Sequence, residues 1–138
     1  MLAAYSTLCY IINMDIFITK KFEKFLKNEN LHSHILQAPA HEVLENRCVA
    51  LGAKLFKVRM KASGRGKSGG YRIIVFLKVR EHLIFLVLFA KNERDNISDN
   101  ELKALKLYAG ELDKLSPREI RAMVDSGALI ELVFSEEG

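Results

Sequence analysis

Hydrophobic positions follow two different periods along this chain, and the change of period separates expected strands from expected helices. Residues 15–19 (DIFIT) are a short β-type run. The next nine residues, KKFEKFLKN, carry apolar side chains at helical spacing. Residues 33–47 are also expected to be helical, with Pro39 near the start or at a kink. The first third of the chain therefore predicts a strand followed by two helices.

Apolar and cationic residues alternate strictly over residues 56–61, which predicts a half-buried strand. Its two faces consist of Phe56, Val58 and Met60 on one side and Lys57, Arg59 and Lys61 on the other. After the glycine-rich segment ASGRGKSGG come two β-prone runs, YRIIVFLKV and HLIFLVLFAK, joined by a short polar turn. The second run is apolar on both faces, so we expect it in the centre of the sheet.

The hydrophobic period becomes helical again after residue 97. Ser98 and Glu101 form a capping box in front of an apolar stripe. Ser116 and Glu119 repeat this start signal, with Pro117 at the first position of a second helix, and Gly127 marks the end of that helix. Residues 128–134 (ALIELVF) can form a last strand. The element order predicts an α+β domain, a small antiparallel β-sheet flanked by helices.

The same patterns predict which side chains form the core. We expect the helices around residues 22–26 and 102–115 to cover one side of an antiparallel sheet. The sheet residues expected to be largely buried are Phe56, Val58, Met60, Ile73, Val75, Phe85 and Val87.

Length and composition fit one globular domain. The chain has 138 residues, of which 49% are hydrophobic and 28% charged. We expect residues 1–13 to be a non-core N-terminal extension and residues 14–138 to be a single domain. Two cysteines give no disulfide framework, which favours a cytoplasmic location. No apolar run reaches the roughly 18–20 residues needed to span a bilayer, so no membrane association is expected.

Charge is distributed unevenly, although the net charge is only +4. Residues 54–80 hold nine basic side chains and no acidic one, whereas the rest of the chain holds 12 basic and 17 acidic side chains. Such a run is often a solvated face. Because it is long, of one sign and interrupted by glycines, it favours a polyanionic partner such as nucleic acid.

The glycine segment matches nucleotide-binding motifs only as a string of letters. Gly64, Gly66 and Gly69 have the G-x-G-x-x-G spacing, but that motif requires a helix after the third glycine, and a strand follows here. A Walker A loop would require a glycine where the chain has Lys61. A hairpin loop with glycines at positive φ remains one interpretation. The other is a cationic loop that approaches a phosphodiester chain, with Arg65 and Lys67 beside the cationic strand.

Other catalytic motifs are absent from the sequence. His32, His34 and His41 do not complete a familiar zinc spacing, so no metal and no cofactor are expected. No serine lies in a nucleophile elbow, and Cys48 has no evident histidine partner.

Two motifs at this spacing resemble a known family. GKSGGYR in a strand-loop-strand and AKNERDNI at a strand end, with the helix and tail that follow, are similar to RelE-like toxins of bacterial type II toxin–antitoxin systems, in the RelE/ParE/HigB superfamily. The resemblance covers roughly residues 14–134. It implies a microbial-RNase-like fold, cleavage of mRNA in the ribosomal A site, and a neighbouring antitoxin that is usually a helix-turn-helix protein.

The resemblance also implies a set of site residues. Lys57 and Arg59 match the family's basic strand, Arg72 matches the arginine of its GYR motif, and Lys91 lies in the strand-end basic segment. The family pattern places a tyrosine just after that segment, where this chain has Asn96 and Ile97. The resulting prediction has two parts: catalytic residues Arg72, Lys91, Lys57, Arg59 and Glu93, and RNA-binding residues Lys54, Lys61, Arg65, Lys67 and Arg94.

The chemistry of RNA transesterification fits these residue types. Arginine forks match phosphate oxygens, and clustered cations lower the pKa of a neighbouring lysine, which lets it carry a proton. Glu93 is a candidate base, or a surface partner of Lys91 or Arg94. Three functions remain open: a ribosome-dependent mRNA endonuclease that inhibits translation, a ParE-like toxin that inhibits gyrase by protein contact, and a nucleic-acid-binding module without catalysis.

Overall fold

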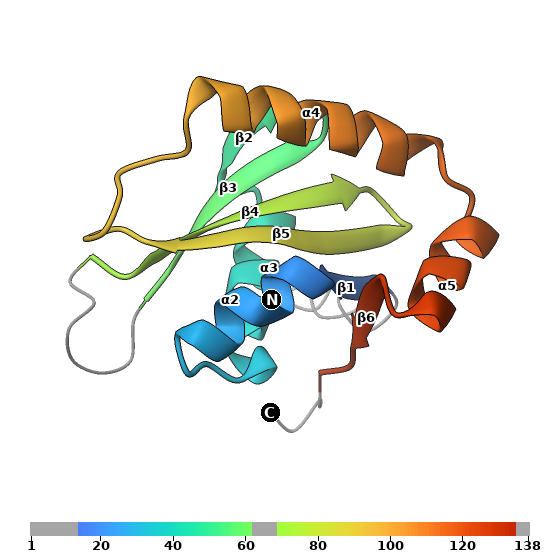
Figure 1. Cartoon of the computed structure of the whole chain (residues 1–138), viewed down its shortest axis with the longest axis horizontal. Helices are drawn as coiled ribbons and strands as arrows, with labels where there is room; N and C mark the ends of the chain where they lie inside the picture. Colours follow the sequence, from blue (N-terminus) through green and yellow to red (C-terminus); the bar gives the residue numbers. More distant parts are fainter. Residues whose placement is uncertain (1–13, 62–68, 135–138) are drawn as a thin grey trace.

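A computed structural model describes residues 14–61 and 69–134. A six-stranded sheet lies between helices on both of its faces (Figure 1). The strands are β1 (Asp15–Thr19), β2 (Val49–Gly52), β3 (Leu55–Met60), β4 (Tyr71–Lys78), β5 (His82–Ala90) and β6 (Leu129–Leu132). The helices are α2 (Lys20–Asn28), the 3-10 helix η1 (Ser33–Leu36), α3 (Gln37–Leu44), α4 (Asp99–Lys114) and α5 (Pro117–Ser126). The predicted extension, residues 1–13, lies outside the described residues.

The sheet has the strand order β2-β3-β4-β5-β1-β6. All neighbouring strands are antiparallel except β1 and β5, which run parallel. The α+β class is therefore confirmed, and β5 lies inside the sheet as its apolar faces predict. The alternation did not reveal β2, because that strand is four residues long and mostly exposed, so it carries no periodic apolar signal.

Helix boundaries follow the sequence signals closely. Both capping boxes form at the starts of α4 and α5, and Gly127 ends α5 in the left-handed region at φ 85°. The segment predicted as one helix, residues 33–47, divides into η1 and α3, with Pro39 in the first turn of α3, where its missing N–H costs nothing. No helix in the described part of the chain is long and apolar enough to cross a membrane.

The prediction that two helices cover the same side of the sheet is wrong. Phe22 and Leu26 of α2 pack with Val58, Ile73 and Phe85 on one face. The α4 residues Ala109 and Leu112 pack on the opposite face, with Leu55, Ile74 and Phe76. Since β4 and β5 are apolar on both faces, each face requires its own helical cover. In Figure 1, α4 lies above the sheet and α2 and α3 lie below it.

A register shift between β4 and β5 explains one further difference. Ile74 pairs with Val87 and Val75 pairs with Phe85, so Leu86 is the extra residue of a β-bulge. Simple alternation would place Phe85 and Val87 on the same face. The bulge instead turns Val87 toward α4, where it is half-buried. Phe56 is also half-buried, and the other predicted sheet residues are buried: Val58, Met60, Ile73, Val75 and Phe85.

Candidate nucleic-acid interface

The cations of β3 lie on the α4 face, at the end of the sheet next to the glycine loop. Lys57 and Arg59 have the same strand parity as Leu55, whose side chain is buried against α4. Arg59 pairs directly with Arg72 across the two strands. The predicted separation of apolar and cationic faces on β3 is therefore confirmed.

The Arg59–Arg72 pair brings two like charges face to face. Leu77 N–H donates to the Lys54 carbonyl at 3.0 Å, so Lys54, just before β3, and Leu77 of β4 are a hydrogen-bonded pair. In an antiparallel ladder, hydrogen-bonded and non-hydrogen-bonded pairs alternate, and Arg59–Arg72 is therefore a non-hydrogen-bonded pair. In such pairs the Cα atoms are about 4.5 Å apart and the side chains are close. Directly opposed like charges are destabilising unless something compensates them. A bound anion between the two strands would provide that compensation.

Arg72 is held by the main chain at the end of the glycine loop. Its Nη1 donates to the carbonyl oxygens of Gly69, at 3.0 Å, and of Tyr71, at 3.2 Å. The Tyr71 hydroxyl donates in turn to Glu29 Oε1 at 2.9 Å, which ties the start of β4 to the end of α2. The guanidinium is thus fixed at the loop end of the sheet, and among the described residues its Nη2 and Nε donors have no hydrogen-bond partner.

Lys91 follows β5 and packs against the same loop end. Its backbone N–H donates to Gly70 O at 3.0 Å, and a Cβ added to Gly69 would meet Lys91 Cγ at 3.1 Å. Gly69 has φ 82°, so close approach and backbone conformation both require glycine there. Lys91 Nζ lies 2.6 Å from Asp95 Oδ1, and this hydrogen bond lowers the pKa of Asp95. Lys91 therefore lies at the loop end of the sheet in an ion pair with Asp95, a partner that the sequence did not identify.

Arg94 connects the loop after β5 to the first turn of α4. Its Nη2 lies 2.6 Å from Glu101 Oε1, and its guanidinium carbon lies 5.1 Å from the centre of the Phe89 ring. The hydrogen bond from Arg94, together with the Ser98 backbone N–H, lowers the pKa of Glu101 to about 2. Glu93 lies in this loop, and its backbone N–H donates to Ala90 O at 3.1 Å. Phe89 pairs with Arg72, so this arrangement borders the Arg59–Arg72 pair.

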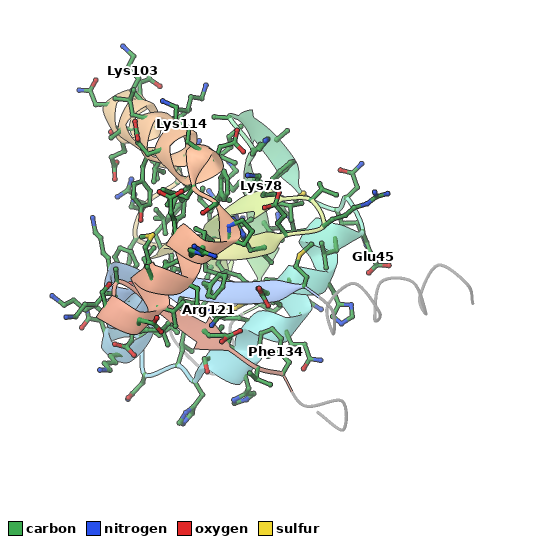
Figure 2. The ribbon with its side chains drawn as sticks, turned by 90° about the vertical axis from the view of Figure 1, so that its right-hand side faces the viewer. Glu45, Lys78, Lys103, Lys114, Arg121 and Phe134 are labelled. Atoms are coloured by element: carbon green, nitrogen blue, oxygen red, sulfur yellow. The ribbon has the colours of Figure 1, made fainter. Side chains whose placement is uncertain are left out.

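Two cations of the basic run lie at the opposite end of the sheet. Lys54 Nζ lies 2.6 Å from Asp113 Oδ1, and Lys78 Nζ donates to the Asp113 carbonyl at 2.9 Å. Figure 2 looks at this end, with Lys78 beneath α4 and with Lys103 and Lys114 on the outer side of that helix. The predicted RNA-binding residue Lys54 is therefore apart from Lys57, Arg59 and Arg72, and it serves to hold α4.

The remaining predicted residues divide between the described and undescribed parts of the chain. Lys61 is exposed just past the end of β3. Arg65 and Lys67 lie in residues 62–68, outside the described residues. The structure adds one cation that the sequence did not single out: Lys106 of α4, whose Nζ would lie 3.3 Å from a Cβ on Gly52 of β2. Lys106 follows Leu102 of the apolar stripe by one helical turn, and this spacing could have identified it from the sequence.

Among the described residues, Lys57, Arg59, Arg72 and Lys106 have no carboxylate partner within ion-pair distance. Lys57, Arg59 and Arg72 are named the cationic face from here on. They come from β3 and β4 toward the glycine loop, whereas Lys106 lies by Gly52, which pairs with Leu55 toward the other end of β3. The cationic face is a surface suited to phosphate groups.

The fold agrees with a comparison to protein families. The family model for the RelE toxin of the RelE/RelB toxin–antitoxin system matches residues 14–132. Because the match covers most of the chain, the chain belongs to the RelE toxin family. The resemblance carried by GKSGGYR and AKNERDNI is thereby confirmed. Toxins of this family pair with an antitoxin.

Proposed function

We propose that this toxin is a ribosome-dependent mRNA endonuclease that inhibits translation. One observation carries the proposal: Arg59 and Arg72 face each other across β3 and β4, and within residues 14–61 and 69–134 neither has a carboxylate at ion-pair distance, which favours an anion at this end of the sheet. A scissile phosphate there would meet guanidinium donors that keep their charge at all working pH values. Lys57, on the same face of β3, adds a third cation.

The proposed reaction is a transesterification that needs no metal. The 2′-oxygen attacks phosphorus, the bond from phosphorus to the 5′-oxygen breaks, and the products are a cyclic phosphate and a 5′-hydroxyl. Arg59 and Arg72 would stabilise the charge that develops on the phosphate oxygens. Lys57 or Lys91 would donate the proton that the 5′-oxygen takes up as it leaves. Glu93 would accept the proton of the 2′-hydroxyl.

The proposed partners follow from the same assignment. The mRNA and the ribosome would contact the cationic face and its loop, where Lys61, Arg65, Lys67 and Arg94 are further candidate RNA contacts. A cognate antitoxin, proposed as a helix-turn-helix protein, would neutralise the toxin in the cytoplasm. An antitoxin that covers the cationic face would prevent RNA from reaching it.

The test is cleavage of mRNA on programmed ribosomes by purified wild type, Arg72→Lys and Arg72→Ala. Loss of one transition-state contact to phosphate costs about 3–4 kcal/mol, so Arg72→Ala should cut roughly a few hundredfold more slowly. Arg72→Lys keeps the charge but loses the fork, so it should also lose most activity. Arg118→Lys, at an exposed site on α5, is the matched control and should cut like wild type.

Two results would contradict the proposal. Equal rates for wild type and Arg72→Ala would remove Arg72 from the site. A wild-type protein that cuts no RNA with or without ribosomes would overturn the endonuclease assignment, and gyrase-dependent DNA breaks in the same cells would then indicate the ParE-like alternative.

A further inference from the structure

A cleft of about 760 Å³ lies beside the cationic face, at the point where β2 begins. Its walls include Arg47, Cys48 and Val49 on one side and residues 57–61 of β3 and its end on the other, with Gly69 and Gly70 at one end. The volume falls in the range of roughly 300–1,000 Å³ that is usual for small-molecule sites. Because Lys57 and Arg59 belong both to the cleft and to the cationic face, the two are continuous.

The cleft exists because β2 covers only half of β3. Val49 pairs with Lys57, and the pairing continues from there to Leu55, so the end of β3 beyond Lys57 has no strand on that side within the described residues. Turn geometry limits β2 at its far end, where Gly52, Ala53 and Lys54 all have positive φ. The edge of the sheet is therefore open next to the candidate phosphate site.

The main chain of Arg59 faces this open edge. The backbone carbonyl of Lys54 accepts a hydrogen bond from β4. Because the backbone groups of successive residues in a strand point to opposite sides, the N–H and C=O of Leu55, Lys57 and Arg59 point to the β2 side. Lys57 uses that side to pair with Val49, whereas none of the strands that the structure describes lies opposite Arg59 on this side. Because Arg59 lines the cleft, its backbone N–H and C=O form one donor and one acceptor at this edge.

The walls of the cleft suit a flat, partly apolar group attached to a phosphate chain. Val58 and Met60 contribute apolar surface, and burial raises the pKa of the Cys48 thiol, which keeps it uncharged. The acidic wall residue, Glu42, is engaged by Arg47, whose Nε lies 3.3 Å from Glu42 Oε2. Lys57, Arg59 and Lys61 are cations of the lining and would face phosphates on either side of such a group.

We propose that the cleft is a nucleobase subsite, which holds the base of a nucleotide next to the scissile phosphate while the Arg59 N–H and C=O bond to its edge. This inference rests on the proposed endonuclease function and names where its RNA substrate is recognised. A base edge offers a donor and an acceptor side by side, which matches a single residue's backbone pair. A peptide that bound as an added strand would need several residues of β3 with backbone groups open to it, and β3 offers only Arg59 among the described residues.

The experiment measures base preference around the cut. Ribosomes are programmed with mRNAs randomised at the positions flanking the cleavage site, and kcat/KM is determined for each base at each position. Wild type should discriminate about tenfold between bases at one flanking position, as expected for hydrogen bonds to a base edge.

Val49→Trp obstructs the cleft from an exposed position, so the fold should tolerate it. Val49 is 55% exposed, and Val79, 61% exposed at the β4–β5 turn far from the cleft, provides the matched control Val79→Trp. Val49→Trp should abolish the discrimination at that position and lower overall cleavage by about tenfold. Val49→Phe, with a smaller obstruction, should show part of both losses, and Val79→Trp should match wild type.

Two outcomes would overturn the subsite while the endonuclease function stands: a wild type that cuts without base preference, or a Val49→Trp protein with wild-type rate and preference. A Val49→Trp protein that cuts normally but no longer binds an acidic extended peptide would also overturn it, in favour of a protein partner. A wild type that cuts nothing would instead contradict the proposed function itself.

Discussion

The role of each cation depends on which group lies beside it. Lys54 and Lys78 share Asp113, and Lys91 is bonded to Asp95, so part of the charge of these side chains is already neutralised. Arg59 has an arginine opposite it instead. A phosphate would relieve that repulsion, whereas at a paired lysine it would have to compete with a carboxylate. Residues of the same type in one stretch of sequence therefore lie in different electrostatic surroundings.

His82 is a buried histidine at the start of β5. It is 3% exposed, its Nε2 has no hydrogen-bond partner there, and it lies between the rings of Phe17 and Phe76. Burial is the main cause that lowers its pKa below the usual value, and Lys78 lowers it further, whereas Glu81, Asp15 and Asp113 act to raise it.

This shift predicts how stability depends on pH. The unfolded chain binds a proton at His82 more readily than the folded one, so the free energy of unfolding should fall as pH decreases from about 6.5 toward the folded-state pKa. A difference of one pKa unit between the folded and the unfolded chain corresponds to about 1.4 kcal/mol in the free energy of unfolding. Urea unfolding at pH 7 and pH 5 should show the loss in wild type and a smaller loss in His82→Phe. His34→Phe, at an exposed position on η1, should behave like wild type. A pH dependence unchanged in His82→Phe would contradict the assignment.

At the scale of the elements, strong local signals predicted helices and strands well. The capping boxes at Ser98 and Ser116 placed the starts of α4 and α5, because a cap is determined by residues three positions apart. The strand β2 and the bulge at Leu86 were not predictable in this way, because both depend on how the neighbouring strand pairs with them. The assignment of α2 and α4 to opposite faces also required the tertiary structure.

Two glycines in neighbouring helices should respond oppositely to the same substitution. Gly110 lies inside α4 and Gly127 ends α5 at φ 85°, and an added Cβ would meet nothing within 4 Å at either site. Gly110→Ala should raise the free energy of unfolding by about 0.5–1 kcal/mol, because alanine is the better helix former. Gly127→Ala should lower it by about 1–2 kcal/mol, because of the left-handed backbone. Urea denaturation measures both, and equal signs would contradict the backbone explanation.

At the scale of the whole molecule, the fold places the cations of residues 54–80 that it describes toward two opposite ends of one sheet. The alternation of β3 predicted that Lys57 and Arg59 share a face, and strand register then placed Arg72 beside them. The ion pairs of Lys54, Lys91 and Arg94 could not be predicted from the sequence, because their partners come from α4 or from loop geometry. The candidate site is therefore smaller than the basic run, and it lies at the end of the sheet near the glycine loop.

This division predicts how salt should weaken RNA binding. For single strands, each phosphate contact contributes roughly 0.7 to the slope of log affinity against log salt, so Lys57→Met/Arg59→Gln should reduce that slope by roughly 1.4. Lys54→Met/Lys78→Met removes the same charge from the end of the sheet where Asp113 already pairs with it, and it should leave the slope near the wild-type value. Binding of a short oligouridylate, titrated by fluorescence anisotropy at several salt concentrations, measures both. Equal reductions in the two double variants would show that RNA binding follows net charge and not the cationic face.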